Sequence, residues 1–92
     1  MRSQRHDELD PMAPQREAAM FYGLFLRGHS VESLRQEIDI PKNLMQRFLR
    51  NGKYEGALRE SMRRSYEYRK QVLAIFDDLV SSEKTRMSVR LH

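Results

Sequence analysis

The sequence predicts an all-α domain of four helices, the last of them long and amphipathic. Two observations support this fold class. Apolar residues recur at helical spacing in four segments of the chain, and glycine, proline or Asn-Gly separates one segment from the next. At 92 residues the chain is long enough for one domain. Without cysteine it has no disulfide to compensate for a small core.

The first predicted helix covers about residues 14–27. Residues 1–14 carry two prolines and several charges and little apolar pattern, so they are expected to form a flexible N-terminal arm. Pro14 suits a first helical turn, where its missing N–H would be unpaired in any case. Gly28 directly follows the segment and can end it in the left-handed conformation.

The second predicted helix covers about residues 31–38. Ser30 is expected to cap its N-terminus, and Leu34 and Ile38 place an apolar stripe along it. The segment Asp39-Ile40-Pro41 should end it. Pro41 disfavours the helical conformation at Ile40, and Asp39 is a residue type that tolerates a left-handed turn.

The third predicted helix, about 41–51, is sharply divided into two faces. Leu44, Met45, Phe48 and Leu49 lie within an arc of about 140°. The remaining arc holds no acidic side chain; it consists of Lys42, Asn43, Gln46, Arg47 and Arg50. Asn51-Gly52 then ends the helix.

The fourth segment, 54–82, has a broad apolar stripe that Ser65 and Arg69 interrupt halfway along. If continuous, it would be about 40 Å long, more than a small core covers. One interpretation is a dimerisation helix, because an exposed apolar stripe needs a partner; it would use Leu58, Met62, Val72, Leu73, Phe76, Leu79 and Val80. The other is a bend near 65–69 that folds the segment back. The tail, 83–92, is expected to be flexible.

Charge is concentrated in the middle third of the chain. Residues 42–70 carry nine Lys or Arg against three Glu, a net charge of +6, whereas residues 1–41 carry a net −2. A basic cluster of this kind attracts polyanions or acidic partners.

The residue types argue against an enzyme. There is no cysteine, no histidine at metal-ligand spacing and no glycine-rich phosphate loop, so we expect no catalytic site, metal or cofactor. No apolar run approaches the ~18 residues of a membrane span, and the N-terminus has no apolar core of a secretory signal. The expected location is the cytoplasm.

Residues 28–52, GHSVESLRQEIDIPKNLMQRFLRNG, resemble a helix-turn-helix DNA-binding domain. Ser30 matches the cap, Leu34 a core position and Ile38 the position before the turn. The motif is similar to small bacterial and phage transcription regulators and to small regulatory subunits of insertion-element transposases. Asp39 stands where glycine is commonest, and Arg35 where a small residue usually lets the helices approach. The resemblance implies a helix-turn-helix domain at 15–53.

The polar arc of the third helix supplies the expected DNA contacts. Arginine and lysine can pair with guanine, and asparagine and glutamine with adenine, in the major groove. Lys42, Asn43, Gln46 and Arg47 lie in the first turns, which enter the groove most deeply. Arg50 and Lys53 lie further along and are expected to meet phosphate. Ser30, at a helix N-terminus, is a further phosphate candidate.

The expected function is sequence-selective binding of double-stranded DNA as a homodimer, in transcriptional or mobile-element regulation. The alternative is a small helical adaptor that binds another protein and no DNA, because the fold alone does not imply DNA binding. Binding to a membrane surface fits less well, since the fourth segment has no tryptophan and only one phenylalanine.

Overall fold

The computed structural model describes residues 10–53 and 55–91, and this part of the chain is all-helical, as predicted. Its helices are α2 (Ala13–Leu26), α3 (Val31–Ile38), α4 (Lys42–Arg50) and α5 (Gly56–Leu91). None of the described residues forms a strand.

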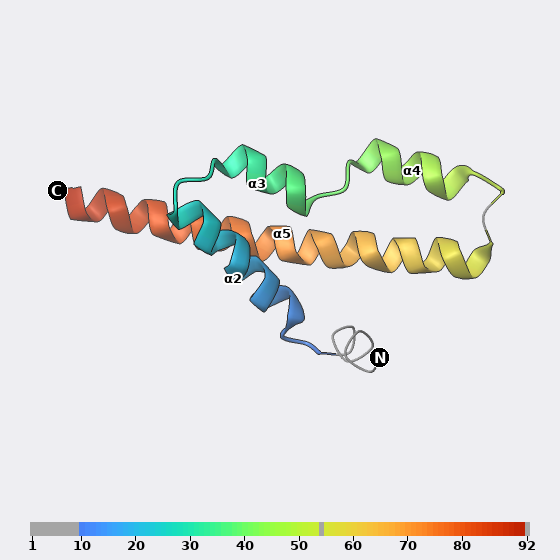
Figure 1. The fold of residues 1–92 in the computed structure, drawn as a ribbon, viewed down its shortest axis with the longest axis horizontal. Helices are drawn as coiled ribbons and strands as arrows, with labels where there is room; N and C mark the ends of the chain where they lie inside the picture. The colour runs from blue at the N-terminus through green and yellow to red at the C-terminus, as the bar shows by residue number, and fades with distance from the viewer. Residues whose placement is uncertain (1–9, 54, 92) are drawn as a thin grey trace.

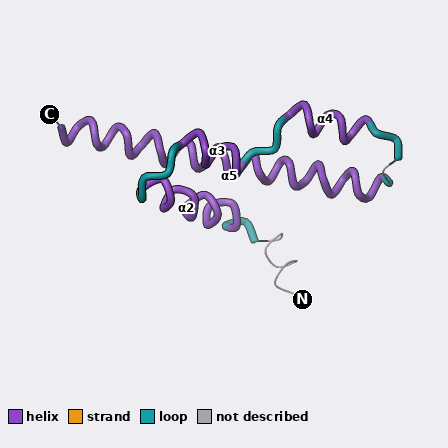
Figure 2. The backbone as a smooth tube through the Cα atoms, turned by 45° about the horizontal axis from the view of Figure 1, so that its top comes forward, coloured by secondary structure: helices purple, strands orange, loops and turns teal. Residues whose placement is uncertain are grey.

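Helix α5 runs the length of the molecule, and the shorter helices lie along it (Figure 1). Its 36 residues span about 54 Å at 1.5 Å per residue. Helix α2 crosses its C-terminal half and makes most of the contacts between helices, while α3 and α4 follow one another along α5 (Figure 2). The molecule measures 57 × 32 × 17 Å, so its short dimension holds only two layers of helices.

Two residues predicted to begin or end a helix do so in the structure. The Ser30 hydroxyl accepts a hydrogen bond from the backbone N–H of Ser33 at 3.1 Å, which caps α3. Gly28 has a φ of 109°, a left-handed value that favours glycine. The short link between α2 and α3 therefore turns at Gly28 and ends at the Ser30 cap.

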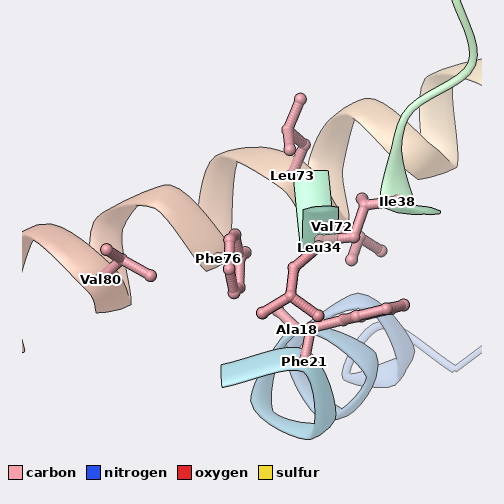
Figure 3. Close-up of a cluster of buried hydrophobic side chains, with 8 residues drawn as sticks. All are labelled: Ala18, Phe21, Leu34, Ile38, Val72, Leu73, Phe76 and Val80. Atoms are coloured by element: carbon pink, nitrogen blue, oxygen red, sulfur yellow. The ribbon is translucent and has the colours of Figure 1, made fainter. Parts of the chain in front are cut away.

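The hydrophobic core lies where α2 and α3 meet the middle of α5 (Figure 3). Phe76 and Val72 of α5 are fully enclosed, as are Ala18 of α2 and Ile38 of α3. The cluster consists of Ala18, Phe21, Leu34, Ile38, Val72, Leu73, Phe76 and Val80. Four of the side chains predicted for dimerisation thus already pack inside one chain.

The fourth helix differs from the prediction in both length and shape. Helix α5 passes through 65–69 without a break and continues to Leu91, so the tail predicted to be flexible is helical over 83–91. The Tyr22 hydroxyl donates a 3.1 Å hydrogen bond to Glu83, and Arg86 pairs with Glu83 one turn along at 3.6 Å. These contacts begin just where the predicted helix ended.

The prediction of a flexible arm over 1–14 is wrong for its last residues. Ala13 and Pro14 belong to α2 and are buried, and the backbone N–H of Met12 bonds to the Asp10 carboxylate at 2.9 Å. Residues 1–9 of the predicted arm lie outside the described residues, as do Tyr54 and residue 92.

Removing Phe76 should strongly destabilise the fold. Phe76→Ala leaves a cavity among α2, α3 and α5, and we expect it to lower the free energy of unfolding by about 3–5 kcal/mol. Met87→Ala is the control, because Met87 is exposed on the same helix beyond the core; its effect should stay within about 0.5 kcal/mol. Urea denaturation followed by circular dichroism measures both, and equal losses would contradict the assigned core.

Removing the Ser30 cap should cost less. Ser30→Ala leaves the N–H of Ser33 without its partner, and a lost cap of this kind lowers stability by about 1 kcal/mol. Ser30→Asp keeps an accepting oxygen and should restore most of that loss. If denaturation shows the alanine and aspartate variants to be equally destabilised, the cap does not contribute to stability.

Candidate nucleic-acid interface

Helix α4 presents its whole predicted polar arc to solvent. The five side chains of that arc are all exposed: Lys42, Asn43, Gln46, Arg47 and Arg50. On the opposite side, Met45 is only 3% exposed, and Phe48 and Leu49 are half-buried. The two faces predicted from the helical wheel are therefore separated in space, with the cations and amides facing outward.

The attachment of α4 to the rest of the molecule is slight. No residue of α4 belongs to the hydrophobic core cluster, and α4 packs on α5 far less extensively than α2 does. Leu44, placed by the helical wheel on the apolar face, is 51% exposed. The helix is thus held mainly through Met45 and its half-buried neighbours, and it forms one edge of the molecule beside the N-terminal half of α5 (Figure 1).

Two of the predicted DNA contacts, Asn43 and Ser30, and the neighbouring Asn51 have side-chain oxygens that accept backbone hydrogen bonds. Asn43 Oδ1 accepts from the backbone N–H of Leu44 at 2.9 Å at the start of α4. Asn51 Oδ1 accepts from the N–H of Lys53 at 2.9 Å just after α4, and Ser30 is engaged in its cap. The two outlying candidates lie beside different helices. Ser30 is at the start of α3, and Lys53 is exposed directly after α4.

The turn between α3 and α4 differs from the prediction. Asp39 has φ −90° and ψ 153°, an extended conformation, and among the described residues no positive φ occurs outside glycine. The expectation of a left-handed turn at Asp39 is therefore wrong. The extended link leads α4 onward along α5 instead of turning it across α3 (Figures 1 and 2).

Ion pairs to α5 account for that extended link. The Asp39 carboxylate lies 2.9 Å from Lys70 Nζ, and this hydrogen bond raises the pKa of Lys70. Arg35, at the position where a helix-turn-helix usually has a small residue, pairs with Asp77 of α5. Both contacts hold the end of α3 against α5, because Arg35 and Asp39 each form an ion pair with a residue of α5.

The structure divides the cations of the basic segment into two groups. Arg69 pairs with Glu17 of α2, and Lys70 with Asp39, so these two are neutralised beside the core. The other seven form no ion pair with a described carboxylate: Lys42, Arg47, Arg50, Lys53, Arg59, Arg63 and Arg64. All seven lie on α4, just after it, or on the N-terminal half of α5 that runs beside it (Figure 1).

Three of these unpaired cations were not among the predicted site residues. Arg63 and Arg64 are exposed and Arg59 is half-buried, all in the first turns of α5. Their charge was visible in the sequence, but their position beside α4 depends on how α5 lies along α4 in the tertiary structure (Figure 1). They extend the basic surface from one helix to two.

The predicted dimerisation residues are divided between the core and the surface. Val72, Leu73, Phe76 and Val80 are buried against α2 and α3. Leu79 and Met62 are half-buried, and Leu58 is exposed. Of the seven residues predicted for this role, Leu58 is therefore the most accessible, and Met62 and Leu79 are partly so.

Other kinds of site find little support in the described part of the chain. It contains no cluster of three or more side chains able to hold a metal ion. No helix within it is both long enough and apolar enough to cross a membrane. Comparison of the chain with protein-family models, curated proteins and solved structures found no match.

Proposed function

We propose that this protein binds double-stranded DNA in a sequence-selective manner through α4, with α3 and α4 forming an open variant of a helix-turn-helix. The observation that carries the proposal is the acid-free polar face of α4, which is wholly exposed and whose cations have no carboxylate partner among the described residues. The biological role that fits is the regulation of transcription or of a mobile element.

Phosphate contacts would supply most of the affinity. Arg50 and Lys53 lie at the end of α4 and just beyond it, and Arg59, Arg63 and Arg64 continue the basic surface on α5. Such cations bind the DNA backbone and fix the position of a protein on the duplex without selecting a sequence.

Base contacts would come from the outer face of α4 itself. Arg47 can donate two hydrogen bonds to guanine, and Gln46 can pair with adenine through both its amide oxygen and its nitrogen. Asn43 is less suited to the adenine contact, because its oxygen already accepts a backbone hydrogen bond. Among the predicted base contacts, Gln46 and Arg47 are therefore the ones we rank first.

A helical adaptor that binds another protein remains the second candidate. The observation that favours it is Leu44, an apolar side chain left 51% exposed beside the basic face of α4. An exposed leucine adds little to a phosphate-binding surface, whereas exposed apolar side chains can form part of a protein interaction site. The two functions separate in the measurements below, because an adaptor that binds only protein would not bind a DNA duplex at low salt.

Binding of a labelled random duplex should weaken steeply with salt. If four cations of this surface each neutralise one phosphate, the logarithm of the affinity falls with a slope of about −3.6. Affinity should then drop about a hundredfold between 50 and 200 mM salt. Fluorescence anisotropy measures this directly, and absence of binding at 50 mM salt would favour the adaptor.

Substitutions on α4 should reduce binding more than the same charge loss elsewhere. We expect Arg47→Ala to cost about 1–3 kcal/mol on a preferred sequence. Gln46→Ala, which changes no charge, should relax the preference for that sequence. Arg86→Ala is the matched control, since it removes one exposed arginine far from α4. Equal losses for Arg47→Ala and Arg86→Ala would exclude α4 as the contact.

A further inference from the structure

The direction of α4 is set by the short link that joins it to α3. Met45 is the one buried residue of α4, and Phe48 and Leu49 are half-buried, so packing holds this helix only lightly. Helix α3 is anchored more firmly, because Ile38 in its last turn is fully enclosed in the core. A lightly packed helix that follows a fixed one takes its direction from the residues between them.

Two of the three link residues are restricted by local chemistry. Proline fixes its own φ, and Pro41 has φ −56° and ψ 134°. It also restricts the residue before it, Ile40, to extended conformations. Asp39 has no such restriction, and aspartate is among the few residue types that also adopt a left-handed conformation. The direction of α4 therefore depends on the conformation of Asp39.

An ion pair with α5 holds Asp39 in the extended conformation. Its Oδ1 atom is shielded from solvent and lies 2.9 Å from Lys70 Nζ. The φ of Asp39 is −90°, so a left-handed turn there would rotate its side chain by about 150° relative to α3. That rotation would carry the carboxylate away from Lys70, and a shielded carboxylate oxygen without a partner is costly.

Lys70 is itself held in place on α5. Its ammonium group lies over the ring of Tyr66, 5.2 Å from the ring centroid and one helical turn earlier. Tyr66 is half-buried, on a face of α5 that it shares with half-buried Met62 and Arg59. The position of the cation that Asp39 meets is therefore determined by α5 and does not depend on α4.

We propose that Lys70 is a positioning residue for DNA binding: its pair with Asp39 keeps the α3–α4 link extended and so keeps α4 beside the start of α5. Three extended residues carry α4 about 10 Å onward from the end of α3. In the alternative arrangement, a left-handed turn at Asp39 would let α4 cross α3, as the second helix of an ordinary helix-turn-helix does. Lys70 acts through this geometry and does not itself contact phosphate.

The extended link matters because the basic surface is built from two helices. Arg47 lies on α4 and Arg59 on α5, and their helices lie side by side only while α4 follows α5 (Figure 1). A duplex binds most tightly when both groups of cations reach its phosphates together. Loss of the pair at Lys70 would separate the two groups although neither is changed. This consequence rests on the proposed DNA binding, whereas the position of α4 is measured without DNA.

The first experiment measures the position of α4 in the full chain without DNA. The chain has no cysteine, so Leu44→Cys and Ser82→Cys, both at exposed positions, place one spin label on α4 and one on the C-terminal half of α5. We expect Lys70→Gln to change the distance between the labels, measured by double electron–electron resonance, by on the order of 5–10 Å, because the link is no longer held extended. Lys70→Arg keeps the ion pair and should leave the distance unchanged. Exchange of the two charges, Asp39→Lys with Lys70→Asp, should restore it.

The second experiment measures DNA affinity, for which positioning and charge alone give opposite expectations. Asp39→Asn adds one unit of positive charge, so an effect of charge alone would strengthen binding of a preferred duplex. Positioning gives the reverse: Asp39→Asn and Lys70→Gln should each weaken binding about tenfold, as the loss of one base contact would. Asp78→Asn is the matched control, because it makes the same change of charge at an exposed position of α5 outside the link; it should not weaken binding.

Either experiment can overturn the proposal. An unchanged distance in Lys70→Gln would show that other contacts place α4, and stronger binding by Asp39→Asn would show that Lys70 acts by its charge. Neither residue belongs to the core cluster, so helix content by circular dichroism should be retained in every variant. If the wild type binds no duplex, the proposed function fails, while the label distances still decide whether Lys70 positions α4.

Discussion

The packing of α2 and α3 against the middle of α5 is the contact on which the rest of the molecule depends. Phe76 and Val72 of α5 are enclosed there together with Ala18 and Ile38, and no other group of side chains forms a comparable cluster among the described residues. Helix α4 and both ends of α5 extend from this centre. A core of this size stabilises a chain of 92 residues only marginally. The exposed surfaces of the other helices are therefore the ones available to partners.

Ion pairs and tyrosine hydrogen bonds surround this core and fix how the helices meet. Glu17 binds both Tyr68 and Arg69, and Asp39 binds Lys70, so α2 and the end of α3 are each joined to α5 by a carboxylate. These pairs are partly exposed, and each adds little stability by itself. Their larger effect is on geometry: the pair at Asp39 favours the extended link that carries α4 along α5. The same pairs neutralise the cations near the core, whereas the cations on and near α4 have no carboxylate partner among the described residues.

The open basic surface suits a polyanionic partner for a physical reason. The surface formed by α4 and the start of α5 is basic and polar, so a polyanion would gain from its unpaired charges. The exposed side of α2 is mixed by comparison: Met12, Met20 and Leu26 are apolar, but Arg16 and Arg27 lie among them on the same side of the helix.

The sequence by itself determined the helices, most of their ends and the two faces of α4, because these depend on spacing and on local hydrogen bonds such as the cap at Ser30. It also located the basic segment. It could not determine the conformation of Asp39 or the uninterrupted course of α5, because both depend on partners distant in the chain, Lys70 for Asp39 and Tyr22 for Glu83. Nor could it show that Phe76 and Val80 are buried within the chain while Met20 and Leu26 are exposed. Helical spacing shows which apolar side chains share a face of a helix, but only the tertiary structure decides which of these faces is covered by another helix.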